Sequence, residues 1–208
     1  MPKAESSAIR VACLGASVTF GRGLADRRNE CYPAVLQRLL DEQAGQGAYQ
    51  VKNFGFSGAT ASRGGNEPYW RTPSLIAAER FEPHLAIVML GVNDAQHANA
   101  AARRTLAPDL ADLVDHFRTL GAEVLLSQTP PAFPPVPEID FDALVNEVRP
   151  TLARVADEVD APLIDFLTPL AGARDQFPDG LHPTAEVARR IAEIAYQAII
   201  ESQSGLSS

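Results

Sequence analysis

The sequence predicts an α/β protein of three layers, in which a parallel sheet of about five strands lies between two layers of helices. Three observations support this prediction. Short apolar runs alternate with longer segments of helical periodicity, one run is apolar at every position, and turn-forming residues follow several of the runs. Alternating strands and helices form right-handed βαβ units, whose strands pair in parallel and whose helices cover both faces of the sheet.

Five short apolar runs are expected to be the strands. They are residues 9–14 (closed by Gly15), 50–54, 85–90, 123–127 and 162–166. The third run, LAIVML, is typical of a central parallel strand that is buried on both faces. It is far too short to span a bilayer, which requires roughly 20 apolar residues in a helix.

Four segments place apolar residues at the spacing of an amphipathic helix. They are residues 32–43, 106–120, 140–159 and 184–200. Pro150 lies inside the third pattern and should kink it, because proline lacks an N–H and clashes with the preceding turn. Pro183 stands where the first residue of the last helix is expected. No repeat or low-complexity linker is present, so residues 1–208 are interpreted as a single domain.

Composition and charge exclude several classes of function. The formal net charge of −8 argues against nucleic-acid binding, which requires a basic surface. Cys13 lies in an apolar run and is expected to be a buried small hydrophobe, with no disulfide. The first ten residues lack the apolar segment of a signal peptide, so a cytoplasmic location without a membrane partner is expected by default. No His, Asp and Cys set has the spacing of metal ligands, and no metal or other cofactor is expected.

The loops after the strands are the place to search for a site, because ligands of parallel α/β proteins bind at the carboxyl ends of the strands. Ser17 follows the first strand, Gly58 lies after the second, and Asn93 follows the third. A hydroxyl, a backbone N–H and a side-chain amide could therefore face one cleft. Each residue also has a purely structural explanation: Ser17 could cap a helix, Gly58 could form a simple turn, and Asn93 could close an Asx-turn.

The last loop contains Asp179 and His182, three residues apart with a glycine between them. The carboxylate can then meet one imidazole nitrogen, which fixes the tautomer and leaves the other nitrogen free as a general base. This pair is harder to explain as a plain turn than the other three residues. The Pro-rich stretch 130–137 also follows a strand, and it is interpreted either as a wall of the site or as a surface loop.

Together, the blocks GASVTFG, NFGFSGAT, GVND and DGLHP resemble the SGNH hydrolase superfamily, also called GDSL esterases and lipases. The resemblance covers almost the whole chain and implies a flavodoxin-like fold. It implies that Ser17 is the nucleophile, that His182 is the general base, and that Asp179 orients the histidine. The oxyanion hole would consist of the backbone N–H groups of Ser17 and Gly58 and the side-chain amide of Asn93.

The first block departs from the family pattern, which usually reads Gly-Asp-Ser, because Ala16 stands in the place of the aspartate. That aspartate is not the acid of the triad, so the expected triad is complete. Its absence removes hydrogen bonds that would hold the nucleophile loop, which puts the rigidity of the loop in question. Asp94 is expected to brace the loop of Asn93 rather than to react.

A narrower resemblance comes from the run EPYWRT at residues 67–72, taken with NFGFSGAT and FPDGLHP. These segments are similar to a subgroup of carbohydrate-associated acetylesterases, which implies a short-chain, acetyl-type esterase and a small-molecule ester such as an acetylated sugar as substrate. Tyr69 and Trp70 are interpreted either as an aromatic platform beside the acyl site or as a hydrophobic anchor for their loop. His97 could reach the same cleft.

Other functions remain open alternatives. A lysophospholipase or thioesterase would use the same residues on longer acyl chains. A non-catalytic binding module of the same fold would have Ala16 as its first sign of decay. The α/β-hydrolase motif Gly-x-Ser-x-Gly and the dinucleotide fingerprint Gly-x-Gly-x-x-Gly are both missing from the chain.

Overall fold

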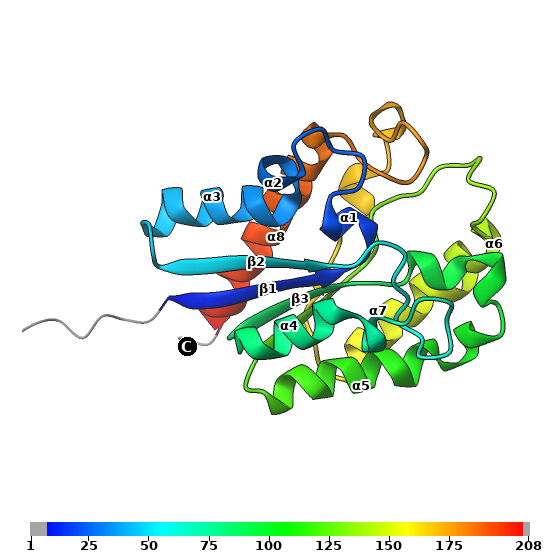
Figure 1. The fold of residues 1–208 in the computed structure, drawn as a ribbon, viewed down its shortest axis with the longest axis horizontal. Coiled ribbons are helices and arrows are strands. Elements are labelled where there is room, and N and C mark those ends of the chain that lie inside the picture. The colour runs from blue at the N-terminus through cyan, green and yellow to red at the C-terminus, as the bar shows by residue number, and fades with distance from the viewer. Residues whose placement is uncertain (1–7, 206–208) are drawn as a thin grey trace, which may run out of the picture.

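A five-stranded parallel sheet forms the middle layer of the protein. The computed structural model describes residues 8–205 (Figure 1). The strands are β1 (Ile9–Gly15), β2 (Tyr49–Gly55), β3 (Leu85–Met89), β4 (Glu123–Ser127) and β5 (Leu163–Ile164). They pair in the order β2-β1-β3-β4-β5, and all neighbours are parallel. This arrangement confirms the fold class that the sequence predicts.

Helices cover both faces of the sheet. The longer ones are α3 (Tyr32–Ala44), α4 (Pro73–Phe81), α5 (Leu106–Thr119), α7 (Arg149–Glu158) and α8 (Ala185–Gly205). The short segments are α1 (Ser17–Phe20), α2 (Arg27–Glu30), η1 (Tyr69–Arg71), η2 (Val92–Ala95), η3 (His97–Asn99), η4 (Ala102–Thr105), α6 (Phe141–Ala143), the π-helical η5 (Leu144–Val148), η6 (Thr168–Leu170) and η7 (Arg174–Gln176). Helices α3 and α8 lie on one face, and α4, α5 and α7 lie on the other (Figure 1).

The two faces of β3 belong to two different apolar clusters. Ala86 and Val88 pack with α4, α5 and α7, whereas Leu85, Ile87 and Met89 pack with α3 and α8. All five side chains are buried, which explains why LAIVM reads as a continuous apolar run rather than an alternating one. The central position predicted for this strand is therefore confirmed.

Cys13 and Cys31 are both buried and free, and the burial that the sequence predicts for Cys13 is confirmed. Burial raises the pKa of the Cys13 thiol to about 12, which keeps it protonated and unreactive. Within residues 8–205, no helix is both long and apolar enough to cross a membrane.

Helix α4 has no counterpart among the helices that the sequence predicts. Thr72 caps its start, because its hydroxyl accepts a hydrogen bond from the N–H of Leu75, and Pro73 is the first residue of the helix. A threonine cap followed by proline is an ordinary start signal for a helix. The helix is only nine residues long, so its apolar periodicity is too short to stand out.

The two proline predictions have different outcomes. The pattern over residues 140–159 is interrupted as expected, because π-helical η5 precedes Pro150, which cannot donate a hydrogen bond to the preceding turn. The expectation for Pro183 is wrong. The last helix begins at Ala185, and the carbonyl of Thr184 accepts the bond from the N–H of Ala188, so Pro183 precedes the helix.

The strand order brings the predicted loops together at one edge of the sheet. Gly15, at the end of β1, is in register with Gly55 of β2 and with Met89 of β3. Because all strands are parallel, the loops that follow these three residues leave the sheet side by side. This is the physical reason that short motifs far apart in the sequence meet in one place.

Candidate active site

Ser17 lies in the short helix α1, which begins two residues after the end of β1. Asn53 fixes this turn, because its side-chain amide donates a 2.6 Å hydrogen bond to the carbonyl of Thr19. The turn also passes very close to Gly55. A Cβ at that position would lie 2.2 Å from the backbone nitrogen of Phe20, so only glycine allows the approach.

Ser17, His182 and Asp179 form a continuous hydrogen-bonded chain. The Oγ of Ser17 lies 2.9 Å from Nε2 of His182, and Nδ1 of the same ring lies 2.6 Å from Oδ2 of Asp179. Ser17 and His182 are largely buried, with 3% and 9% of their surfaces exposed. The arrangement supplies a hydroxyl, a base in contact with it and a carboxylate that orients the base.

The turn from Asp179 to His182 is held by its own backbone. Oδ1 of Asp179 accepts hydrogen bonds from the N–H groups of Leu181 and His182, at 2.9 and 2.7 Å. Gly180 has a φ of 78°, and a Cβ there would lie 2.2 Å from the carbonyl oxygen of Phe133. The glycine between the acid and the histidine is therefore required by both the turn and its packing.

The environment of Asp179 favours its charged form. Partial burial raises the pKa of this carboxyl, but hydrogen bonds from the His182 ring and from the N–H groups of His182 and Leu181 outweigh burial. The net result lowers the pKa to about 2. The carboxylate is thus available to orient His182 over the whole pH range in which imidazole titrates.

We expect the Asp179 carboxyl to remain ionised between pH 8 and pH 4. A group with a lowered pKa in the folded state contributes stability above the unfolded value of about 3.9, and that stability is lost as the pH falls toward 2. The measurement is the pH titration of the Asp179 carboxyl ¹³C signal, assigned by comparison with Asp179→Asn. The pH titration of the same signal in urea-unfolded protein is the control and should show a midpoint of about 3.9. A midpoint for Asp179 above pH 4 would contradict the prediction.

A cavity of about 440 Å³ opens beside the hydroxyl of Ser17. It is lined by five of the sequence-predicted site residues: Ser17, Gly58, Asn93, Asp179 and His182. Residues 135–139, which follow β4, form another part of its wall. Of the two interpretations of the Pro-rich stretch, the structure therefore supports the wall of the site.

The amide of Asn93 has a single orientation. Its Nδ2 donates to the carbonyl of Ala59 at 2.9 Å, and its Oδ1 accepts from Nε2 of Gln96 at 3.0 Å. An amide nitrogen carries two hydrogens, so one remains for a ligand in the cavity that Asn93 lines. If the two amide atoms of Asn93 were exchanged, an oxygen would face the carbonyl oxygen of Ala59 and a nitrogen would face Nε2 of Gln96.

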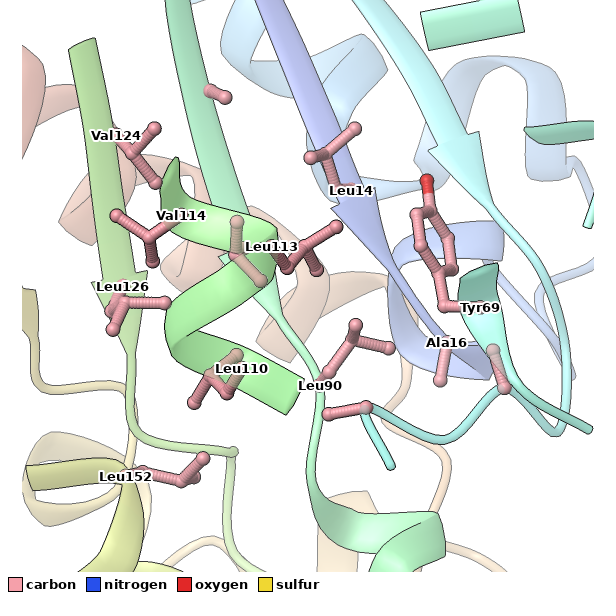
Figure 2. Packing of buried hydrophobic residues seen from close by; sticks show 14 of the residues in the cluster. Leu14, Ala16, Tyr69, Leu90, Leu110, Leu113, Val114, Val124, Leu126 and Leu152 are labelled. Carbon is pink, nitrogen blue, oxygen red and sulfur yellow. The ribbon is translucent and has the colours of Figure 1, made fainter. Parts of the chain in front are cut away.

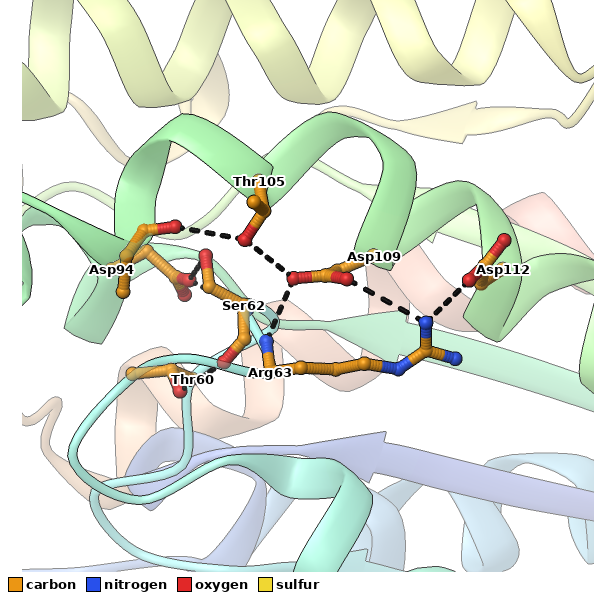
Figure 3. Close-up of polar contacts among 8 residues, drawn as sticks. Thr60, Ser62, Arg63, Asp94, Thr105, Asp109 and Asp112 are labelled. Carbon is orange, nitrogen blue, oxygen red and sulfur yellow. Dashed lines mark hydrogen bonds and ion pairs between the residues drawn. The ribbon is translucent and has the colours of Figure 1, made fainter.

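The side chain of Asp94 bonds to the loop after β2 (Figure 3), whereas the sequence predicts a brace for the loop of Asn93, in which Asp94 itself lies. The side chain is fully buried and accepts hydrogen bonds from the N–H of Ala61 (2.9 Å) and from the N–H and hydroxyl of Ser62 (2.8 and 2.6 Å). Burial raises its pKa, although the three hydrogen bonds act in the opposite direction. Asp109 extends the brace by accepting a bond from the N–H of Arg63.

The side chain of Ala16 occupies a purely apolar place (Figure 2). It is 4% exposed and belongs to the same cluster as Leu14, Tyr69 and Leu90. The turn that carries Ser17 is held by Asn53 and by the bond from the N–H of Phe56 to the carbonyl of Gly15, at 2.9 Å.

The three residues proposed to bind substrate lie elsewhere, and none lines the cavity. Tyr69 is fully buried, and its hydroxyl donates to the carbonyl of Phe54. Trp70 packs under the guanidinium of Arg63, 4.0 Å from the ring centroid. His97 has a side chain that is 64% exposed. The aromatic platform is therefore wrong: Tyr69 and Trp70 anchor their loop, and His97 lies on the surface.

The cavity also contains residues that the sequence reasoning did not single out. They are Arg22, Ser57, Gln96, Glu138, Ile139 and Leu181. A signal existed for Gln96, because residues three apart in a 3₁₀ turn are eclipsed, and Gln96 lies three residues after Asn93. Ser57 adjoins Gly58 in sequence. No local pattern points to Arg22 or Glu138.

Fold and site together define a class of protein: a three-layer α/β protein with a Ser-His-Asp arrangement at the carboxyl edge of its sheet, as found in serine hydrolases. A model of the GDSL-like lipase/acylhydrolase family matches residues 13–190. The chain therefore belongs to the GDSL-like lipase/acylhydrolase family.

Comparisons with individual proteins agree with this assignment. The chain is 31% identical over 219 residues to the acetylxylan esterase of Xylanibacter ruminicola, in a match that covers 96% of this chain and 45% of that protein. The chain thus spans less than half the length of this curated relative. Its fold is similar to those of the acetyl xylan esterase AlAXEase (TM-score 0.72, 19% identity, 92% and 100% of the two chains) and TesA (TM-score 0.69, 26% identity, 91% and 97%).

Proposed function

We propose that this chain is a serine esterase that hydrolyses short-chain, acetyl-type carboxylic esters. In this proposal Ser17, His182 and Asp179 are the catalytic triad. The observation that carries the proposal is the contact of 2.9 Å between the Ser17 hydroxyl and Nε2 of His182, at the wall of an open cavity. Membership of an acylhydrolase family supports the same chemistry.

The geometry supports a two-step acyl transfer. Nε2 of His182 takes the proton of Ser17 as Oγ attacks the ester carbonyl carbon, and then gives that proton to the leaving alcohol when the carbon–oxygen bond breaks. Water, activated by the same nitrogen, then attacks the acyl-serine and releases the carboxylic acid. Asp179 remains charged throughout and stabilises the imidazolium that forms twice in each cycle.

Three donors are proposed to stabilise the oxyanion. Ser17 is the first residue of α1, so its backbone N–H has no partner within the helix. The N–H of Gly58 and the second amide hydrogen of Asn93 complete the set, and all three residues line the cavity. Such donors act on charge that develops in the transition state, and loss of one typically lowers the rate about 10²–10³-fold.

Acetylated carbohydrates are the proposed natural substrates. The support comes from relatives: the curated relative is named an acetylxylan esterase, and a structural neighbour is described as a two-domain esterase active on acetylated mannans (TM-score 0.66, 20% identity, 94% of this chain and 50% of that chain). The chain spans less than half of the curated relative, so the activity and substrates of that whole protein are carried over to this chain only as a proposal.

The test is hydrolysis of p-nitrophenyl esters from acetate to octanoate, followed by acetate release from acetylated xylo-oligosaccharides. We expect kcat/KM to be highest for acetate and to fall with chain length. A maximum at longer chains would favour a lysophospholipase or thioesterase activity. Absence of turnover with every ester, in folded protein, would overturn the proposal and favour the binding module of the same fold.

A further inference from the structure

Four side-chain amides, one of them that of Asn93, form a connected group. Asn66 donates to Oε1 of Gln96 at 3.2 Å, and Gln96 donates to Oδ1 of Asn93 at 3.0 Å. Asn99 donates to Oδ1 of Asn66 at 3.0 Å and to the backbone carbonyl of Asn93 at 2.8 Å. The group therefore joins the turn after β3 to the loop at Asn66.

The group has one direction of donation. Asn99 fixes the amide of Asn66, because Asn99 donates to its Oδ1 and accepts from its backbone N–H at 2.9 Å. Asn66 must then present its Nδ2 to Gln96, and Gln96 must present its Nε2 to Asn93. Reversal of any amide places two donors or two acceptors against each other, which leaves polar groups without partners in a partly buried place.

Gln96 is the link between this group and the cavity. Its backbone N–H donates to the carbonyl of Asn93 at 3.1 Å, which closes the 3₁₀ turn, and its side chain lies over the amide three residues earlier. It also lines the cavity that contains Ser17 and His182. Within residues 8–205, the side-chain amide of Gln96 is the group that donates a hydrogen bond to Oδ1 of Asn93.

We infer that Gln96 is a positioning residue for the reaction, which holds the amide of Asn93 with its nitrogen toward the cavity. The inference rests on the proposed function, in which Asn93 stabilises the oxyanion. Donation to Oδ1 also polarises the amide and makes its N–H a stronger donor. A preorganised donor costs no reorganisation when charge develops, so the effect should appear in kcat rather than in KM.

The decisive variant is Gln96→Glu, which keeps the size of the side chain and replaces the donor by an acceptor at neutral pH. A carboxylate facing Oδ1 of Asn93 should turn the amide and withdraw its nitrogen from the cavity. We expect kcat for p-nitrophenyl acetate to fall about 10- to 100-fold at pH 8, with KM changed less than about threefold. Gln50→Glu, an exposed residue near the start of β2, is the matched control with the same change in charge and should retain wild-type kcat.

The pH dependence separates positioning from damage to the fold. Protonation of the introduced carboxylate in Gln96→Glu restores an O–H donor toward Asn93, so the ratio of wild-type to variant kcat should shrink as the pH falls from 8 to 5. Other charged groups that line the cavity are Arg22, Glu138, Asp179 and His182. They are common to both proteins, so their titration largely cancels in the ratio. Gln96→Met, which has no donor at any pH, should lose kcat with a ratio that does not change.

Each outcome decides the inference. A kcat for Gln96→Glu within threefold of wild type overturns it, and so does a loss with a pH-independent ratio. If Gln96→Glu does not fold, Gln96→Met decides: unchanged kcat overturns the inference, and a selective loss of kcat supports it. Ser17→Ala is assayed in parallel. Activity that survives in Ser17→Ala would overturn the proposed function itself, whereas loss there together with a normal Gln96→Glu would overturn the positioning role alone.

Discussion

Replacement of Ser17 by alanine is expected to lower kcat for p-nitrophenyl acetate on the order of 10⁶-fold, the largest effect of any single change considered for this chain. The hydroxyl lies 2.9 Å from Nε2 of His182, and without it no acyl intermediate can form at this place. The fold should remain, because the side chain is small and its hydroxyl bonds to His182 rather than to the backbone of the core. Steady-state kinetics and thermal unfolding measure the two effects.

Covalent labelling gives an independent reading of the same prediction. An organophosphonate ester should add one phosphonyl group per chain to the wild-type protein, located on Ser17 by peptide mass spectrometry, and none to Ser17→Ala. Ser204→Ala, at the far end of α8, is the control and should behave as wild type. Labelling at another residue, or a Ser17→Ala variant with more than a hundredth of wild-type kcat, would contradict the nucleophile assignment.

Replacement of Asp94 by alanine is expected to cause the largest loss of stability, about 2–6 kcal/mol in the free energy of unfolding. The change removes the acceptor of two buried backbone N–H groups, those of Ala61 and Ser62, and an unsatisfied buried donor costs about 1–3 kcal/mol. Such a loss is a large part of the total stability of a typical domain. Urea unfolding followed by circular dichroism measures it.

Asp112→Ala is the matched control, because Asp112 is an exposed carboxylate whose partner, Arg63, is also exposed. Exposed ion pairs contribute about 1 kcal/mol or less, so this variant should unfold close to wild type. Equal stabilities of Asp94→Ala and Asp112→Ala would show that water replaces the lost carboxylate. The role of Asp94 as the brace between two loops of the site would then be wrong.

The strands and most of the helices could be predicted because their signals are local. The apolar run at residues 85–90 and the amphipathic spacing at residues 106–120 agree closely with β3 and α5. Helix α4 was missed because nine residues carry too little periodicity. Strand β5 has two residues, fewer than the expected run 162–166, and it pairs with β4 at the edge of the sheet. Local patterns do not determine where pairing ends.

The residues at Ser17, Asn93 and His182 could be proposed from the sequence because the fold class dictates that loops after parallel strands meet. The proposal for Tyr69 and Trp70 failed for the opposite reason. An aromatic side chain near a site can face the cavity or the core with equal ease, and the sequence does not specify its direction. The hydroxyl of Tyr69 finds its partner at the carbonyl of Phe54, inside the core.

The sequence alone determined the chemistry of the site: which hydroxyl, imidazole, carboxylate and amide are available, and on which loops they lie. Tertiary structure decided what surrounds them. It placed residues 135–139 in the wall of the cavity that Ser17 also lines, and it set Gln96 between Asn93 and Asn66. The physical reason is the distance along the chain over which each effect acts. Backbone preference and apolar periodicity act over a few residues, whereas the orientation of an amide or the wall of a cavity depends on partners that only the folded chain brings into contact.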